Sequence, residues 1–328
     1  MNYRTLGKTA IKVSEVGLGG LFVSSYGATQ EQARLAVHRA LELGVNYVDT
    51  APGYMDSEDV LGFALEGVPQ PYILSTKLGG RPQPFEPQNK EHLRQSVEMS
   101  LKLLKRETID ILMIHEPDRP GQYDWFTDWE TFQGPVCEFL DELKAEGLIR
   151  FTGIGGTTAY TLPPIIATGK YDVVLTAFNY SLLWQEALHA ILPEAIKQGM
   201  GIIIGSPLQQ GALSRRYDDE VNHGARWLSP ARRQQYKRLY ALLDDLDMPL
   251  AELAMRWVLT NPNISTVLSG VRSVDEIEMN VHAVAAGPLP QDVLDRIQEI
   301  ADMVPFRPFE EPFGLPFGRT YKGPGWAR

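Results

Sequence analysis

The sequence predicts an α/β fold in which eight parallel strands close into a (β/α)8 barrel. Short apolar runs alternate with longer amphipathic stretches, and eight such runs follow one another along the chain. Several runs are apolar on both faces, as in residues 109–114, which is typical of strands buried between a barrel interior and an outer ring of helices. An open doubly wound sheet usually has about six strands, so the count favours a closed barrel.

The predicted strands are short apolar runs, most of which end in a small or polar residue. In chain order they are residues 16–20, 45–50, 72–76, 110–115, 151–155, 172–177, 201–206 and 266–270.

The predicted helices begin with residues 33–43. Thr29 and Gln32 form a capping-box pattern ahead of this segment, and Gly44 closes it. Leu35, Val37, Leu41 and Leu43 would form its apolar stripe. Similar amphipathic stretches are residues 90–104, 136–146, 188–198, 231–246, 251–259 and 274–285.

We expect a single barrel domain over residues 1–328. Residues 1–14 read as an N-terminal hairpin that could plug the bottom of the barrel. Residues 116–135 and 209–230 are insertions after the fourth and seventh strands, so these long loops should lie over the C-terminal face, where barrel enzymes hold their active sites. Residues 305–328 form a C-terminal tail.

Composition narrows the function. The chain has 31 basic and 41 acidic residues, a net charge of −10, which argues against a nucleic-acid partner. Cys137 is the single cysteine, so no intramolecular disulfide or thiolate cluster can form, and a reducing cytoplasm fits best. No apolar stretch is long enough for a membrane span, and the six histidines lack metal-ligand spacing. We therefore expect a cytoplasmic protein without a metal or a membrane partner.

Four residues that can move or stabilise a proton stand at the C-terminal ends of strands two to four. They are Asp49, Tyr54, Lys77 and His115. Each alone has an ordinary alternative, such as a helix cap for the aspartate or a solvated rim charge for the lysine. Together they converge on the face of the barrel that carries catalysis.

Several short segments, spread in order over most of the chain, carry a resemblance to a known family. They are residues 6–9 with 13–19, residues 49–51 with Tyr54, residues 75–77, residues 109–110 leading to His115, residues 154–155, residues 206–208 with Gly211 and Leu213, and residues 270–273 with Asn280. With these segments the chain resembles the aldo-keto reductases.

The resemblance implies that the four residues are a catalytic tetrad. Tyr54 would be the general acid/base, and Lys77 would stabilise its phenolate, since a free tyrosine has a pKa of about 10. Asp49 would hold Lys77 by an ion pair, and His115 would orient the substrate oxygen. The hydride must come from a nicotinamide, because no side chain can deliver one.

The cofactor site implied by the resemblance is not a Rossmann site, and the chain lacks a Gly-x-Gly-x-x-Gly fingerprint after a strand. Its expected residues are Gly20, Thr157, Thr158, Tyr180, Ser206, Pro207, Leu208, Gly211, Leu213, Gly270, Arg272, Glu276 and Asn280.

The sequence departs from the family pattern at two points, and one of them is that residues 175–180 lack the usual glutamine of the sixth strand. Where many members have Ser-Asn against the nicotinamide carboxamide, this chain reads Gly-Gly-Thr-Thr at residues 155–158. Tyr180 could stack on the nicotinamide ring. Arg272 could pair with an adenosine 2′-phosphate, whereas Glu276 would repel it unless it accepts a ribose hydroxyl instead. These residues favour NADP(H), with NAD(H) as the alternative.

Three tryptophans in the insertions, Trp125, Trp129 and Trp227, could line a substrate pocket or simply pack the loops onto the barrel. Residues 177–183 are similar to a segment of the sugar 1-dehydrogenase branch of the family. The expected function is an NAD(P)-dependent oxidoreductase acting on a small aldehyde, ketone or sugar. Two alternatives remain: a non-catalytic, NADP-binding regulatory subunit, and an aldolase in which Lys77 forms a Schiff base.

Overall fold

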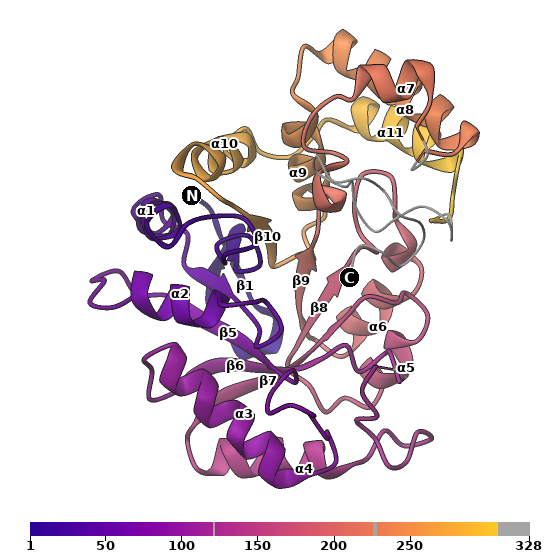
Figure 1. Cartoon of the computed structure of the whole chain (residues 1–328). Coiled ribbons are helices and arrows are strands. Elements are labelled where there is room, and N and C mark those ends of the chain that lie inside the picture. The colour runs from indigo at the N-terminus through magenta and orange to yellow at the C-terminus, as the bar shows by residue number, and fades with distance from the viewer. Residues whose placement is uncertain (121, 226–227, 308–328) are drawn as a thin grey trace.

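The computed structural model describes residues 1–120, 122–225 and 228–307. Eight parallel strands close into a barrel in the order β10-β3-β4-β5-β6-β7-β8-β9 (Figure 1). The strands are β3 (Val16–Gly19), β4 (Tyr47–Asp49), β5 (Ile73–Leu78), β6 (Ile109–His115), β7 (Ile149–Gly156), β8 (Val173–Ala177), β9 (Gly201–Gly205) and β10 (Thr266–Gly270). The predicted (β/α)8 fold is confirmed, and each strand overlaps the apolar run that predicted it.

The helices surround the barrel and cover its outer face (Figure 1). They are α1 (Gln30–Glu42), α2 (Ser57–Ala64), α3 (Lys90–Leu103), α4 (Pro135–Ala145), α5 (Leu162–Ile166), α6 (Ile191–Lys197), α7 (Asp218–His223), α8 (Pro230–Leu246), α9 (Leu250–Thr260), α10 (Val274–Ala285) and α11 (Gln291–Asp302). Helices α7, α8 and α11 lie together at the upper right of Figure 1. No helix in the described ranges is long and apolar enough to cross a membrane.

Helix α1 has the predicted N-terminal cap, but it begins at Gln30, three residues before the predicted segment 33–43, and ends at Glu42, and it buries a different face. The Thr29 hydroxyl accepts from the Gln32 N–H at 3.3 Å, while the Gln32 side chain accepts from the Thr29 N–H at 3.0 Å. The buried side is mostly alanine, and Leu35 is 46% exposed. Small side chains let the helix lie close to the barrel. The predicted apolar stripe was therefore wrong for Leu35, whereas Val37 and Leu41 are buried as predicted.

The N-terminal hairpin closes the bottom of the barrel. Strands β1 (Tyr3–Thr5) and β2 (Lys12–Ser14) pair antiparallel around a short 3-10 turn. Leu6 and Val13 are fully buried and join the side chains that fill the barrel interior. The turn requires a glycine, because Gly7 has φ +48° and a Cβ there would lie 2.2 Å from the Gly201 nitrogen. The predicted plug is confirmed.

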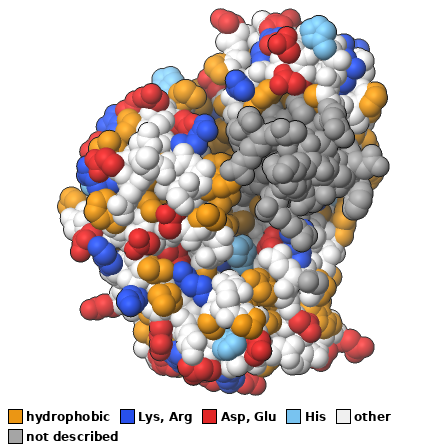
Figure 2. Space-filling view, viewed as in Figure 1, with side chains coloured by type: hydrophobic (Ala, Val, Ile, Leu, Met, Phe, Trp, Pro, Cys, Tyr) orange, Lys and Arg blue, Asp and Glu red, His pale blue; other side chains and the backbone are white. Residues whose placement is uncertain are grey.

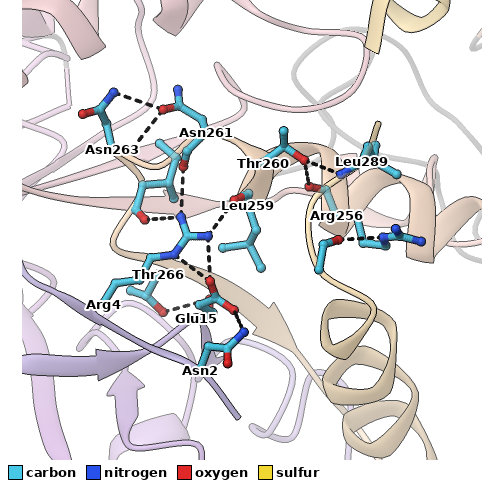
Figure 3. Close-up of polar contacts among 12 residues, drawn as sticks. Asn2, Arg4, Glu15, Arg256, Leu259, Thr260, Asn261, Asn263, Thr266 and Leu289 are labelled. Carbon is cyan, nitrogen blue, oxygen red and sulfur yellow. Dashed lines mark hydrogen bonds and ion pairs between the residues drawn. The ribbon is translucent and has the colours of Figure 1, made fainter. Parts of the chain in front are cut away.

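One arginine ties this hairpin to the rest of the barrel (Figure 3). Arg4 donates to the carbonyl oxygens of Leu259 at 2.6 Å, Asn261 at 2.9 Å and Ile264 at 2.8 Å, around the C-terminus of α9. It also donates to the Glu15 carboxylate at 2.7 Å. The last carbonyl oxygens of a helix have no hydrogen-bond partner within the helix. The Arg4 guanidinium donates hydrogen bonds at this end, and its positive charge is attracted by the negative C-terminal end of the helix dipole.

The visible surface carries charges of both signs. In Figure 2, acidic and basic side chains intermingle over α1, α2 and α3. One such contact joins α3 to the end of α4, where Arg94 pairs with Glu146 at 2.6 Å. The view shows no large field of one sign on that part of the surface.

Candidate functional site

The tetrad residues come from three neighbouring strands. Asp49 is the last residue of β4, Lys77 lies near the end of β5, and His115 ends β6. Because β4, β5 and β6 are adjacent and parallel, their C-terminal ends meet at one rim. Tyr54 follows β4 in the loop before α2. The structure therefore brings the four predicted catalytic residues together.

Lys77 forms a buried ion pair with Asp49. Its Nζ donates to Asp49 Oδ2 at 2.6 Å and to the Thr50 carbonyl oxygen at 2.7 Å. Asp49 Oδ1 accepts from the Ser75 hydroxyl at 3.0 Å. Both residues are 1% exposed. Burial alone would lower the pKa of Lys77, but the charge of Asp49 beside it raises that pKa, so Lys77 remains an ammonium ion.

Tyr54 lies against both Lys77 and His115. Lys77 Nζ is 4.7 Å from the centroid of the Tyr54 ring, and the rings of Tyr54 and His115 meet edge to face with centroids 5.7 Å apart. Burial raises the pKa of the Tyr54 hydroxyl; the charge of Lys77 lowers it, and the carboxylates of Asp49 and Glu116 raise it again. The net shift is upward, so Tyr54 holds its proton at neutral pH.

His115 is neutral. Burial, and then the nearby charge of Lys77, lower its pKa to about 3. At physiological pH one ring nitrogen can therefore donate a hydrogen bond without the residue carrying charge.

A cavity of about 350 Å³ opens beside Asp49 and Tyr54 and extends to Arg272 and Glu276. Its volume is within the range of small-molecule sites. Of the residues predicted to bind the cofactor, those that line it are Gly20, Ser206, Pro207, Leu208, Gly211, Gly270, Arg272, Glu276 and Asn280. Gly20 is required there, since a Cβ would lie 2.6 Å from the Asp49 carbonyl oxygen.

Arg272 and Glu276 form an ion pair at the far end of the cavity. Arg272 Nε donates to Glu276 Oε1 at 3.0 Å, and the Arg272 backbone N–H donates to Oε2 at 2.8 Å. Asn280 lies one helical turn further along α10 and donates to the Ser269 hydroxyl at 2.6 Å. The Glu276 carboxylate is thus paired with Arg272, the residue that was expected to bind a phosphate.

Four predicted cofactor residues do not line this cavity. Leu213 is fully buried in the core. Thr157 and Thr158 donate their backbone N–H groups to Asp118 Oδ2 at 2.9 and 2.6 Å, and the Thr158 hydroxyl donates to the same oxygen at 2.6 Å. Asp118 also occupies the space beside Gly156, where a Cβ would be 2.8 Å from its carboxylate.

The fourth residue, Tyr180, points away from the cavity. Its ring packs on Trp257 with centroids 4.8 Å apart, and its hydroxyl accepts from Asn261 at 3.2 Å. The chain turns sharply after β8, where Phe178 has φ +68°, and this turn carries Tyr180 to the outside of the barrel. Stacking of Tyr180 on a nicotinamide is therefore not supported by its position.

The tryptophans of the first insertion pack the loop. Trp125 has no exposed surface and donates its indole N–H to the His115 carbonyl oxygen at 3.1 Å. Trp129 donates to Asp124 at 2.9 Å and packs on Phe126 and Phe132. Trp125 thus supports the backbone of a tetrad residue instead of presenting a wall to substrate. Trp227 lies outside the described residues.

Sequence reasoning missed three charged residues around the site. Arg215 lines the cavity, and Glu116 and Asp118 follow His115 at the mouth of the barrel. Their position could have indicated them, because each lies in one of the two insertions expected at the C-terminal face, where the sequence analysis had singled out no charged residue. In the part of the chain that the structure describes, no three His, Cys, Asp or Glu side chains gather as a metal site would require.

Comparisons with known proteins agree with this geometry. The model of the aldo/keto reductase family matches residues 15–302. L-galactose dehydrogenase from Arabidopsis thaliana is 32% identical over 315 residues, covering 92% of this chain and 94% of the relative. A probable voltage-gated potassium channel subunit beta from the same plant is 25% identical over 346 residues, covering 94% of this chain and 99% of the relative.

Among solved structures, the aldo-keto reductase AKR11C1 from Bacillus halodurans, in its holo form, superposes with a TM-score of 0.75. It is 29% identical, and the alignment covers 92% of this chain and 96% of that chain. The family match covers far more than half of the sequence and includes every tetrad residue. This chain belongs to the aldo/keto reductase family.

Proposed function

We propose that this protein is an NAD(P)-dependent oxidoreductase that acts on a small aldehyde, ketone or sugar, with Tyr54 as general acid/base. The observation that carries the proposal is the buried Lys77–Asp49 pair beside Tyr54, where the tyrosine faces a cavity large enough for a small molecule. A buried cation next to a phenol has a clear chemical use, since it stabilises the phenolate that forms when the proton leaves.

The bound nicotinamide supplies the hydride for reduction, or accepts it in oxidation. In reduction, the Tyr54 hydroxyl gives its proton to the oxygen of the carbonyl group as it gains negative charge. Lys77 stabilises the phenolate that remains, and Asp49 holds Lys77 in place. His115, being neutral, donates a hydrogen bond that orients the substrate oxygen.

The chemistry of the cavity fits a dinucleotide. Its near end holds the proton donor, and its far end holds the guanidinium of Arg272. The lining also includes Ser206, whose hydroxyl can donate to a phosphate oxygen, and Arg215, whose guanidinium can pair with a phosphate. Ser206 has φ +55°, a conformation that a residue with a side chain adopts at some cost, as is common where backbone lies against a ligand.

The choice between the two cofactors depends on Arg272 and Glu276. Arg272 supports NADP(H), because a guanidinium binds a phosphate in a fork. Glu276, paired with it, would compete with the 2′-phosphate for the same cation but would accept a hydrogen bond from the 2′-hydroxyl of NAD(H). The proposal keeps NADP(H) as the preferred cofactor and NAD(H) as the alternative.

Neither alternative function is favoured by the site. A Schiff base requires a neutral amine, and Asp49 raises the pKa of Lys77. The regulatory alternative has one relative behind it, which is named as a probable voltage-gated potassium channel subunit beta. A pure cofactor sensor has no need of a buried Lys77 beside Tyr54. The name of the L-galactose dehydrogenase relative supports a sugar among the possible substrates.

The test is a titration of NADPH and NADH by quenching of tryptophan fluorescence, with Arg272→Ala and Glu276→Gln in parallel. We expect NADPH to bind more tightly than NADH. Arg272→Ala should weaken NADPH by about 10-fold or more, as expected for loss of a charged hydrogen bond, and Glu276→Gln should strengthen it.

Two other results would change the assignment. Tighter binding of NADH, weakened by Glu276→Gln and indifferent to Arg272→Ala, would assign NAD(H) instead. Binding of a cofactor without turnover of any compound in a broad panel of aldehydes, ketones and aldoses would support the regulatory alternative.

A further inference from the structure

Ser75 lies directly beside Asp49 in the wall of the barrel. Strands β4 and β5 are parallel neighbours, and their register pairs Asp49 with Ser75. Side chains two residues apart on a strand point to the same face, so Ser75 and Lys77 share one face of β5. Both residues therefore reach the Asp49 carboxylate from the neighbouring strand.

The Ser75 hydroxyl has a specific partner in this buried layer. The residue has no exposed surface, and its hydroxyl donates to Asp49 Oδ1 at 3.0 Å. Within the described ranges, no other side chain donates to Oδ1, whereas Oδ2 accepts from Lys77 at 2.6 Å. The carboxylate is thus held at both of its oxygens, which fixes the orientation of its plane.

The backbone of Ser75 supports the second acceptor of Lys77. Its carbonyl oxygen accepts from the Thr50 N–H at 2.9 Å, and the Thr50 carbonyl oxygen accepts from Lys77 Nζ at 2.7 Å. Asp49 and Thr50 together take two of the three N–H donors of the ammonium. The third can turn to the oxygen of Tyr54, whose ring centroid is 4.7 Å from Nζ.

A hydroxyl that donates to a carboxylate takes up part of its negative charge. Without the Ser75 hydroxyl, Asp49 Oδ1 would be a buried anionic acceptor with no donor among the described residues, which is costly. The carboxylate could relieve this cost by rotating, which would shift the oxygen that Lys77 contacts, or by taking a proton, which would leave Lys77 without a counter-ion. Either change would weaken the stabilisation of the Tyr54 phenolate.

We infer that Ser75 is a positioning residue for the proton transfer. Its hydroxyl fixes the Asp49 carboxylate and shares its charge, so that the Lys77 ammonium stays where it stabilises the phenolate of Tyr54. Ser75 is too deeply buried to touch substrate or cofactor, so it acts through Asp49. This inference rests on the proposed function and adds to the tetrad a residue that supports it from below.

The test is a double-mutant cycle with Ser75→Ala and Tyr54→Phe. The rate of nicotinamide oxidation or reduction is measured in a single turnover at saturating cofactor, with the best substrate of the panel of aldehydes, ketones and aldoses. In the wild-type background we expect Ser75→Ala to slow this rate by about 10-fold, the lower end of the range for a hydrogen bond to a charged group. In the Tyr54→Phe background it should slow the rate by less than about twofold. A packing defect would instead slow both backgrounds by the same factor.

Ser96→Ala is the matched control. Ser96 is also fully buried, in α3, and its hydroxyl has no hydrogen-bond partner in the part of the chain that the structure describes. This variant should leave the single-turnover rate unchanged. Ser75→Cys keeps a weaker S–H donor at the site, so its rate should fall between those of wild type and Ser75→Ala. Urea denaturation checks the folding of each variant, and Ser75→Cys takes the place of Ser75→Ala in the cycle if the latter does not fold.

Two results would overturn the role of Ser75 and leave the proposed function standing. One is an equal slowing by Ser75→Ala in both backgrounds, and the other is a rate of Ser75→Ala within about twofold of wild type. Turnover of no carbonyl compound or alcohol by wild type would overturn the proposed function and the role of Ser75 with it.

Discussion

Lys77 is an ammonium ion with almost no solvent around it, and it is stable there because Asp49 neutralises it. Removing one partner of a buried ion pair leaves an uncompensated charge. We expect Lys77→Met to lower the free energy of unfolding by about 3–5 kcal/mol, measured by urea denaturation. The double variant Lys77→Met/Asp49→Leu should recover most of this loss. A single variant as stable as wild type would contradict the buried pair.

The lowered pKa of His115 makes the free energy of unfolding depend on pH. Its pKa is about 3 in the folded protein and about 6.5 when unfolded, so between these values only the unfolded chain binds the proton. Lowering the pH through this window should therefore destabilise the fold, by at most about 1.4 kcal/mol per pH unit from this residue.

The measurement for His115 compares urea unfolding at pH 4 to 7 in wild type and in His115→Gln. The variant lacks the titrating ring, so its free energy of unfolding should fall less steeply toward acid pH. Parallel curves for the two proteins would show that the ring is not held neutral in the fold.

At the residue scale, the sequence predicted the tetrad better than the cofactor site. Strand ends place Asp49, Lys77 and His115 at one rim whatever the details of the loops, so topology alone brings them together. Tyr180 is different, since its direction depends on the backbone turn at Phe178. The spacing of residues along the chain does not report such a turn. The same limit applies to Trp125, whose burial depends on how the insertion folds back.

At the scale of elements, Arg4 joins the hairpin to the end of α9. Arg4→Met would leave three carbonyl oxygens and the Glu15 carboxylate without this donor. We expect the free energy of unfolding to fall by about 3 kcal/mol, because the buried acceptors lose charged hydrogen bonds.

Arg34→Met is the matched control for Arg4. Arg34 pairs with Glu31 on the exposed side of α1, where such pairs contribute less than about 0.5 kcal/mol. Equal losses of stability in the two variants, measured by urea denaturation, would mean that the contacts of Arg4 around α9 stabilise the fold no more than an exposed ion pair does.

Strands were predicted more completely than helices. Most barrel strands contain a short apolar run, as in β6, β8 and β9, and this signal is strong because parallel strands are buried on both faces. Helices α2, α5 and α7 are short, from 5 to 8 residues, and carry little periodic signal. Helix α11 could have been found from Val293, Ile297 and Ile300, which share one buried face. It begins after a proline without a side-chain cap, so the usual start signal was missing.

At the scale of the whole molecule, the barrel makes one site from distant parts of the chain. The cavity joins Asp49 and Tyr54, near the start of the chain, to Arg272 and Glu276 near its end. The closed order of strands explains this, because β10 pairs with β3 and so brings the last strand of the barrel beside the first strand of the barrel.

The central claim is that Tyr54 transfers the proton that accompanies hydride transfer. The most direct test is a rapid-mixing measurement of nicotinamide oxidation or reduction in a single turnover, with wild type and Tyr54→Phe at saturating cofactor and the best substrate of the panel. Loss of a general acid should slow this step by about 10²- to 10⁴-fold while the cofactor binds as tightly as before. An equal rate in both proteins would contradict the claim and move the proton transfer to another residue of the site.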